Sequence, residues 1–153
     1  MSETPAEHDA KIIAEFRASG GRVGGVWEGT PLLLLHHSGA TSGVSRVNPL
    51  AYLPEGPRYL IWASNGGAAS HPGWYHNLKA HPSTRIEVGG EALDVVAEEA
   101  AGAQRERLWA GAVERYPQLI EVARKAADRV IPLTVLTPVA EHSRRTAAQK
   151  EQT

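Results

Sequence analysis

Apolar residues along the chain fall into short extended runs separated by turn-forming residues, with helical spacing in a few places. Ile12, Ile13 and Phe16 share one face of a predicted helix, whereas the unbroken run from Leu32 to Leu35 is typical of a buried strand. Pro117 interrupts the longest helical segment, because proline cannot continue a helix from its middle. The predicted elements are a helix over 10–18, strands over 32–35, 46–53, 59–63, 85–88, 92–97 and 131–136, a short helix ending at 78, and two successive helices within 104–128.

This pattern predicts a mainly β fold with flanking helices, in a single domain. The chain has 153 residues, a length that suits one domain. An antiparallel sheet of about six short strands exposes its edges unless it closes, so we expect a split β-barrel, closed or half-closed. We expect a flexible N-terminus over 1–10, the folded domain over 11–139, and a disordered tail over 140–153, where the sequence is polar and lacks periodicity.

Composition excludes several classes of function. The formal charge of -1 predicts no surface for nucleic acid, and the absence of cysteine excludes disulfides, a thiolate nucleophile and cysteine-based metal sites. No G-x-S-x-G motif indicates a hydrolase. No apolar run approaches the roughly 20 residues of a membrane span, so we expect a soluble, cytoplasmic protein. His71, His76 and His81 recur every fifth residue and therefore fall on different helix faces, which argues against a metal site.

Two loops rich in small residues follow predicted strands. Residues 38–46 combine glycines and hydroxyl side chains with Arg46, so backbone N–H groups and a guanidinium could meet at one anion. Residues 63–70 have side chains small enough to admit a flat ring against the backbone. From spacing alone, an ordinary turn is the more frequent case for either loop. His36 and His37 point to opposite faces of their strand, so at most one of them reaches a pocket.

Four co-linear motifs indicate a family. They are FRASGGRVGG from residue 16, PLLLLHHSGATSGVSRVNPL from residue 31, WASNGG from residue 62 and HPGWYHNLKAHP from residue 71. With RLWAGAVERYP and IPLTVL, they make the chain resemble the deazaflavin-dependent nitroreductase family from residue 11 to residue 136. The resemblance implies a split β-barrel of the FMN-binding kind. It also implies coenzyme F420, an 8-hydroxy-5-deazaflavin, as hydride carrier to a small quinone, enone or nitro acceptor.

The resemblance also implies a cofactor site. Residues 39–46 correspond to the family's site for the phosphate tail of F420, residues 48–49 lie beside the deazaflavin ring, and residues 63–67 back onto it. Trp74 and Asn77 match an aromatic and an amide contact from the following short helix. The full set is Gly39, Ala40, Thr41, Ser42, Gly43, Arg46, Asn48, Pro49, Ala63, Ser64, Asn65, Gly66, Gly67, Trp74 and Asn77.

Aromatic residues are candidates for the acceptor side. Trp27, Tyr52 and Tyr116, together with Trp74, would line a pocket for a planar apolar acceptor, and core packing is an equally good interpretation of each. The protein would mainly bind and orient the reactants and exclude water, without a protein nucleophile. The proton that completes the reduction could come from solvent, His37 or Tyr116.

Two alternatives stay open. The chain has Ala40, Thr41 and Asn65 where the family often has lysine or arginine, and the loss of these cations would suit a noncatalytic cofactor or small-molecule carrier on the same fold. The barrel could instead bind FMN, with Arg46 and the loop hydroxyls holding a single phosphate. The sequence indicates neither the natural acceptor nor the oligomeric state.

Overall fold

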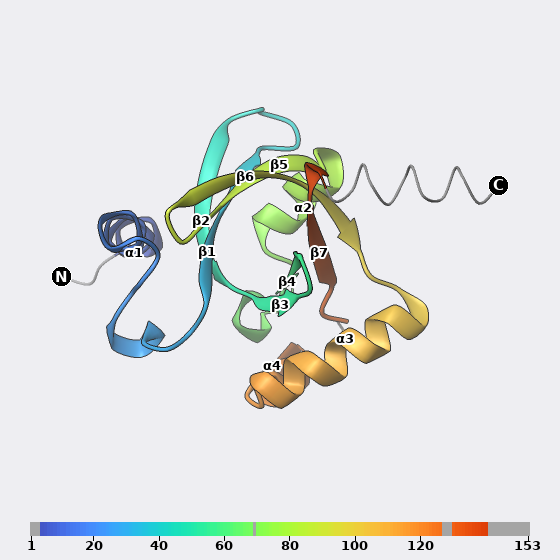
Figure 1. Cartoon of the computed structure of the whole chain (residues 1–153). Coiled ribbons are helices and arrows are strands. Elements are labelled where there is room, and N and C mark those ends of the chain that lie inside the picture. Colours follow the sequence, from blue (N-terminus) through green and yellow to red (C-terminus); the bar gives the residue numbers. More distant parts are fainter. Residues whose placement is uncertain (1–3, 69, 127–129, 141–153) are drawn as a thin grey trace.

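The structure, a computed structural model, describes residues 4–68, 70–126 and 130–140, and the tail from residue 141 onward lies outside this range. The elements are α1 (Pro5–Ser19), η1 (Gly25–Trp27), β1 (Leu32–Ser38), β2 (Ser45–Ala51), β3 (Leu53–Glu55), β4 (Arg58–Trp62), η2 (Asn65–Gly67), α2 (Gly73–Ala80), β5 (Ser83–Val88), β6 (Glu91–Glu99), α3 (Gly102–Arg115), α4 (Leu119–Ala126) and β7 (Leu133–Pro138). One curled sheet has α1 on one side and α3 and α4 on another (Figure 1). In these ranges no helix is both long and apolar enough to cross a bilayer.

The sheet curls into a barrel because one stretch of chain supplies both of its edges. All neighbouring strands are antiparallel, in the order β2-β1-β5-β6-β7-β4-β3. β2 and β3 lie at opposite edges, yet only Tyr52 separates them in the sequence. The two edges must therefore lie close together, which a flat sheet of seven strands would not allow. The predicted single-domain, antiparallel split barrel is confirmed.

Most predicted boundaries shift by a few residues, and two of the differences have a clear structural reason. The strand expected over 46–53 is broken at Tyr52 into β2 and β3, because the chain passes there from one sheet edge to the other. The first helix begins at Pro5, within the segment expected to be flexible. The Thr4 side chain accepts a hydrogen bond from the Glu7 N–H at 3.1 Å, which caps the helix at this earlier point.

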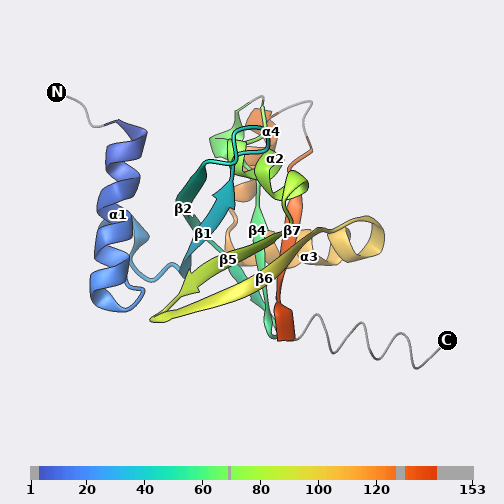
Figure 2. The same cartoon turned by 90° about the horizontal axis from the view of Figure 1, so that it is seen from above.

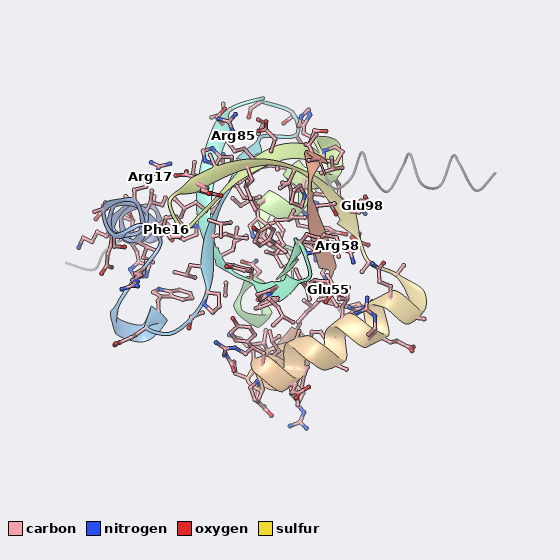
Figure 3. All side chains as sticks on the ribbon, in the orientation of Figure 1. Phe16, Arg17, Glu55, Arg58, Arg85 and Glu98 are labelled. Carbon is pink, nitrogen blue, oxygen red and sulfur yellow. The ribbon has the colours of Figure 1, made fainter. Side chains whose placement is uncertain are left out.

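Both faces of β1 are covered, which explains its uninterrupted leucines. Leu33 and Leu35 are fully buried in the cluster to which α2 also contributes. Leu32 and Leu34 point the other way and belong to a second cluster with Phe16, on the side of α1 that meets the sheet (Figure 3). A strand with apolar neighbours on both faces has no alternation of polar residues. The packing of β1 therefore fixes α1 beside the strand that leads into the first small-residue loop.

α3 and α4 cover another part of the barrel. Leu108 of α3 and Leu119 of α4 share a buried cluster with Leu60 of β4 and Leu133 of β7. Pro117 separates the two helices, as the sequence predicts. The turn between them brings the start of α4 against the barrel beside the end of β4.

An ion-pair cluster fastens α1 to the sheet. The Arg17 guanidinium donates two hydrogen bonds to the Glu87 carboxylate of β5, at 3.1 and 2.7 Å, and His36 Nε2 lies 2.7 Å from the same carboxylate. Figure 3 shows Arg17 on α1 near the sheet. The hydrogen bonds from Arg17, with a smaller contribution from His36, lower the pKa of Glu87 from its ordinary 4.5 to about 2, although partial burial acts in the opposite direction.

We expect the free energy of unfolding to depend less on pH in acid for Glu87→Gln than for the wild type. A carboxylate whose pKa is depressed by folding stabilises the fold above its unfolded-state pKa of 4.5, and this contribution is lost as the pH falls toward 2. The free energy of unfolding, measured by urea denaturation from about pH 6 to about pH 2, should fall more steeply for the wild type than for the variant. Glu91→Gln, at an exposed position of β6, is the control. Equal slopes for the wild type and Glu87→Gln would contradict the assignment.

Candidate active site

A large cavity opens at the end of the barrel where the two small-residue loops lie. Its volume is about 810 Å³. The loop between β1 and β2 and the helix α2 lie at this end (Figure 2). β2, the end of β4 with the residues that follow it, and Asp9 of α1 also contribute to the lining. Segments far apart in the sequence therefore form one cavity bounded mostly by small and polar residues.

A second, smaller cavity of about 430 Å³ adjoins the first. Its lining includes η1, the start of α4 and the residues just before it. Four residues line both cavities: Pro49, Leu50, Trp62 and Ser64. Molecules bound in the two cavities would therefore meet at this shared boundary.

A continuous series of hydrogen bonds follows the wall of the large cavity. The Ala40 N–H donates to Asn77 Oδ1 at 2.9 Å, and Asn77 Nδ2 lies 2.9 Å from His37 Nδ1. His37 Nε2 lies 2.5 Å from Asn48 Oδ1, and Asn48 Nδ2 donates to Asp9 Oδ2 at 3.1 Å. His37 is only 5% exposed, and this burial lowers the pKa of its imidazole. The imidazole is therefore uncharged near neutral pH. The hydrogen-bond series that passes through it connects α1, β1, β2, α2 and the loop between β1 and β2.

The loop between β1 and β2 is a tight turn in which two backbone N–H groups have no acceptor among the described residues. The Gly43 N–H donates to the Gly39 carbonyl at 2.9 Å, and Gly43 has a φ of +70°, which glycine adopts without strain. Within the described ranges, the N–H groups of Thr41 and Ser42 have no hydrogen-bond partner. Arg46 is exposed and has no ion-pair partner in the same ranges. Two free N–H donors and one free guanidinium on one cavity wall are able to bind an anion.

Most of the predicted cofactor residues meet in the large cavity. Those that line it are Gly39, Ala40, Thr41, Ser42, Arg46, Asn48, Pro49, Ser64, Asn65, Trp74 and Asn77. Those outside its lining are Gly43, Ala63 and Gly67, whereas Gly66 lies outside the residues whose surroundings the structure describes. Ala63 is fully buried in the core, and Gly67 turns against α4 with a φ of +84°, where a Cβ would lie 2.9 Å from Lys125 Cβ. Ala63 and Gly67 therefore shape and pack their loop without facing the cavity.

The predicted acceptor residues separate in the structure. Trp27 and Tyr116 line the small cavity, Trp74 lines the large one, and Tyr52 lines neither. The Tyr52 ring packs against Tyr59 with ring centroids 5.3 Å apart. The Tyr116 hydroxyl donates to the Tyr52 carbonyl at 3.1 Å, and burial raises the pKa of this phenol. The Tyr52 side chain therefore does not line the small cavity, and Tyr52 is connected to that cavity by the hydrogen bond that its carbonyl accepts from Tyr116.

Sequence reasoning missed two charged lining residues. Asp9 falls in the segment expected to be flexible, but α1 carries it to the large cavity. Arg115, the last residue of α3, lines the small cavity, with its guanidinium carbon 4.7 Å from the centre of the Tyr116 ring. Arg115 lies within the motif RLWAGAVERYP, but no local pattern assigns a function to either residue, because each comes from a polar helix face that meets the barrel only in the tertiary fold.

Comparison with known proteins assigns the chain to a family. The sequence model of the F420H(2)-dependent quinone reductases matches residues 10–138. The chain belongs to the F420H(2)-dependent quinone reductase family. An F420H(2)-dependent quinone reductase of Mycobacterium tuberculosis is 39% identical over 127 residues, which cover 81% of this chain and 85% of the relative. The expected resemblance to deazaflavin-dependent reductases is confirmed, and the family shown is that of the quinone reductases rather than that of the nitroreductases.

Two solved structures resemble this member of the quinone reductase family. One, described as an F420-H2 dependent reductase (FDR-A), is 40% identical and has a TM-score of 0.63; the match covers 69% of this chain and 93% of that one. The other, described as a domain-swapped dimer, is 34% identical and has a TM-score of 0.66; the match covers 87% of this chain and 99% of that one. The likeness extends over more than two thirds of this chain in both cases.

The large cavity of this quinone reductase family member fits a deazaflavin cofactor. F420 combines a flat ring with an anionic tail, so its site needs hydrogen-bond donors around the tail and a flat surface beside the ring. The unpaired N–H groups of Thr41 and Ser42 and the guanidinium of Arg46 fit the tail. Ser64 and Trp74, a small side chain and an aromatic one, fit the ring.

Proposed function

We propose that the protein transfers a hydride from reduced F420 to a quinone-type acceptor. The observation that carries this proposal is the shared boundary of the two cavities, at Pro49, Leu50, Trp62 and Ser64. A cofactor ring in the large cavity and a planar acceptor in the small one would be neighbours there, as hydride transfer requires. When bound, F420 supplies the hydride chemistry, and the protein supplies binding, orientation and exclusion of water.

The loop of residues 39–46 holds the anionic tail in this proposal. Among the described residues that line the large cavity, Arg46 is the one arginine or lysine. A guanidinium without an ion-pair partner is able to form two parallel hydrogen bonds to a phosphate without first breaking another contact. The N–H groups of Thr41 and Ser42 add uncharged donors, which offset in part the cations that are absent at Ala40 and Asn65.

The small cavity suits an acceptor that gains negative charge during reduction. Arg115 is the one charged side chain in the described lining. Arg115 Nη2 donates to the Gly29 carbonyl at 3.3 Å, and the guanidinium lies over the Tyr116 ring, so both contacts hold the cation at the cavity. A quinone oxygen gains negative charge as hydride adds to the ring, and a fixed cation stabilises that charge. Trp27 and Leu119 supply apolar surface for the ring of the acceptor.

Solvent supplies the final proton in this proposal. Both side chains considered as donors already direct their protons to protein acceptors, since His37 Nε2 faces Asn48 Oδ1 and the Tyr116 hydroxyl donates to the Tyr52 carbonyl. Burial raises the pKa of Tyr116, which makes its phenol a weaker acid. A reduced quinone oxygen in an accessible cavity is able to take its proton from water.

Fluorescence titration with F420, followed by turnover with menadione, tests the proposal. We expect saturable F420 binding and menadione-dependent oxidation of the reduced cofactor. Absence of saturable binding up to roughly 50 μM F420 would overturn the proposal. Binding of F420 without turnover of menadione or other quinones would favour the noncatalytic carrier, and tighter binding of FMN than of F420 in a parallel titration would favour an FMN protein.

A further inference from the structure

The hydrogen-bond series through His37 has one possible direction. At one end the Ala40 N–H is able only to donate, and at the other end the Asp9 carboxylate is able only to accept. Asn77 must therefore turn its oxygen to Ala40 and its nitrogen to His37 Nδ1. Asn48 must turn its nitrogen to Asp9 and its oxygen to His37 Nε2. Only the neutral imidazole with its hydrogen on Nε2 completes the series.

We propose that His37 is a positioning residue of the cofactor site, which holds the Asn48 and Asn77 amides in the orientation that Asp9 and Ala40 select and tethers the loop of residues 39–46 at Ala40. The proposal rests on the proposed function, because its ligand is F420. Both amides line the large cavity, and each NH2 group has a second hydrogen that the series does not use. The series that His37 completes thus makes the two asparagines offer N–H donors, rather than oxygens, to the carbonyl groups of a deazaflavin ring.

A second proton on His37 would break this arrangement. Both ring nitrogens would then be donors, and Nδ1–H would face the NH2 group of Asn77. Asn77 would have to turn its oxygen toward His37 and give up the hydrogen bond from the Ala40 N–H, 2.9 Å away. The loop that precedes Arg46 would lose its tether to α2, and F420 would bind more weakly.

Charged and titratable groups reach His37 from several neighbouring elements. Arg46 on β2 and His36 on β1 disfavour its protonation, in addition to burial. Asp9 on α1 lies at the far end of the hydrogen-bond series, and His71, before α2, lines the same cavity. Variants at position 37 leave all these groups and the cofactor unchanged. A difference in pH dependence between such variants and the wild type therefore reports on His37 itself.

Three variants distinguish a role of His37 in positioning the two asparagines from a role in filling space. Gln at position 37 presents an acceptor and a donor about as far apart as the two imidazole nitrogens and does not titrate, so His37→Gln should retain the series. His37→Leu fills a similar volume without a polar atom, so Asn48 and Asn77 should both lose their hydrogen bond to the side chain at position 37. His36→Leu is the matched control, because His36 lies on the opposite face of β1, bonded to Glu87 and outside the lining of the large cavity.

The affinity for F420, measured by fluorescence titration, is the first readout. At about pH 7.5 we expect His37→Gln and His36→Leu within about twofold of the wild type, and His37→Leu about tenfold weaker. Between about pH 7.5 and about pH 4.5 the wild type should lose about fivefold more affinity than His37→Gln, because only the wild type gains the second imidazole proton, and burial shifts that protonation below the ordinary imidazole pKa of 6.5. Parallel pH profiles for these two folded proteins would overturn the proposal, even if His37→Leu failed to fold.

Nitrogen-15 NMR of the cofactor-free protein is the second readout. We expect the His37 ring to carry its hydrogen on Nε2, and the Ala40 amide to exchange with solvent faster in His37→Leu than in the wild type or His36→Leu. A hydrogen on Nδ1, or unchanged Ala40 exchange in folded His37→Leu, would overturn the proposal. Failure of the wild type to bind F420 would instead overturn the proposed function, and NMR would still test the role of His37.

Discussion

Arg46→Ala should weaken the binding of F420 by about tenfold or more, the change that corresponds to losing about 1.4 kcal/mol of a charge-assisted contact. Arg46 is the one arginine or lysine in the described lining of the large cavity, and it has no ion-pair partner in the described ranges. The whole interaction of the guanidinium with an anionic tail is therefore lost in the variant. Fluorescence titration at low and moderate salt measures the change, which should shrink as salt screens the charge.

Two further variants control for this prediction. Arg46→Lys retains the charge but not the planar pair of donors, so its affinity should lie between those of the wild type and Arg46→Ala. Arg85→Ala removes a cation of β5 that pairs with Asp94 at 3.1 Å and lines neither the large nor the small cavity. It should bind F420 as the wild type does. Equal affinities for wild type and Arg46→Ala would show that the tail binds elsewhere.

Val122→Trp should abolish most quinone reduction while leaving the affinity for F420 unchanged. Val122 lies on α4, lines the small cavity and is absent from the lining of the large one. An indole at this position would occupy much of a cavity of about 430 Å³, so the acceptor would lose its place beside the shared boundary. We expect kcat/KM for menadione to fall by roughly tenfold or more, mainly through KM.

Arg124→Trp provides the matched control for Val122→Trp. Arg124 lies on the same helix, has a side chain 72% exposed and does not line the small cavity. The same new side chain there should leave menadione kinetics unchanged. A large loss of F420 affinity in Val122→Trp, or equal loss of turnover in the two variants, would contradict the assignment of the small cavity to the acceptor.

The β1–β2 loop shows how far the sequence leads toward the site. Its glycines and hydroxyl residues, followed by Arg46, are adjacent in the chain, so their position together on one wall of the large cavity is predictable from local geometry. The loop after β4 is only partly predictable. Ser64 and Asn65 line the large cavity, whereas Gly67 packs against α4, because contact with a helix more than fifty residues later decides which side of the loop faces the ligand.

The environments of the two histidines of β1 are also only partly predictable from the sequence. Alternation along a strand correctly predicts that His36 and His37 face opposite ways. Which of them faces the cavity depends on the register with β2 and on the helices that cover each face. His37 meets Asn48 and Asn77, while His36 meets Glu87. No local pattern distinguishes these two environments.

The sequence by itself determined the strand and helix types and the place of the loop of small and hydroxyl residues before Arg46, because hydrophobic periodicity and turn chemistry act between residues close in the chain. Only the tertiary structure decided that Asp9 and Arg115 reach the cavities and that Tyr52 lies outside their lining. These positions depend on how the ends of α1 and α3 meet a curled sheet. That curvature results from β2 and β3 being forced to opposite edges, a constraint that no short segment contains.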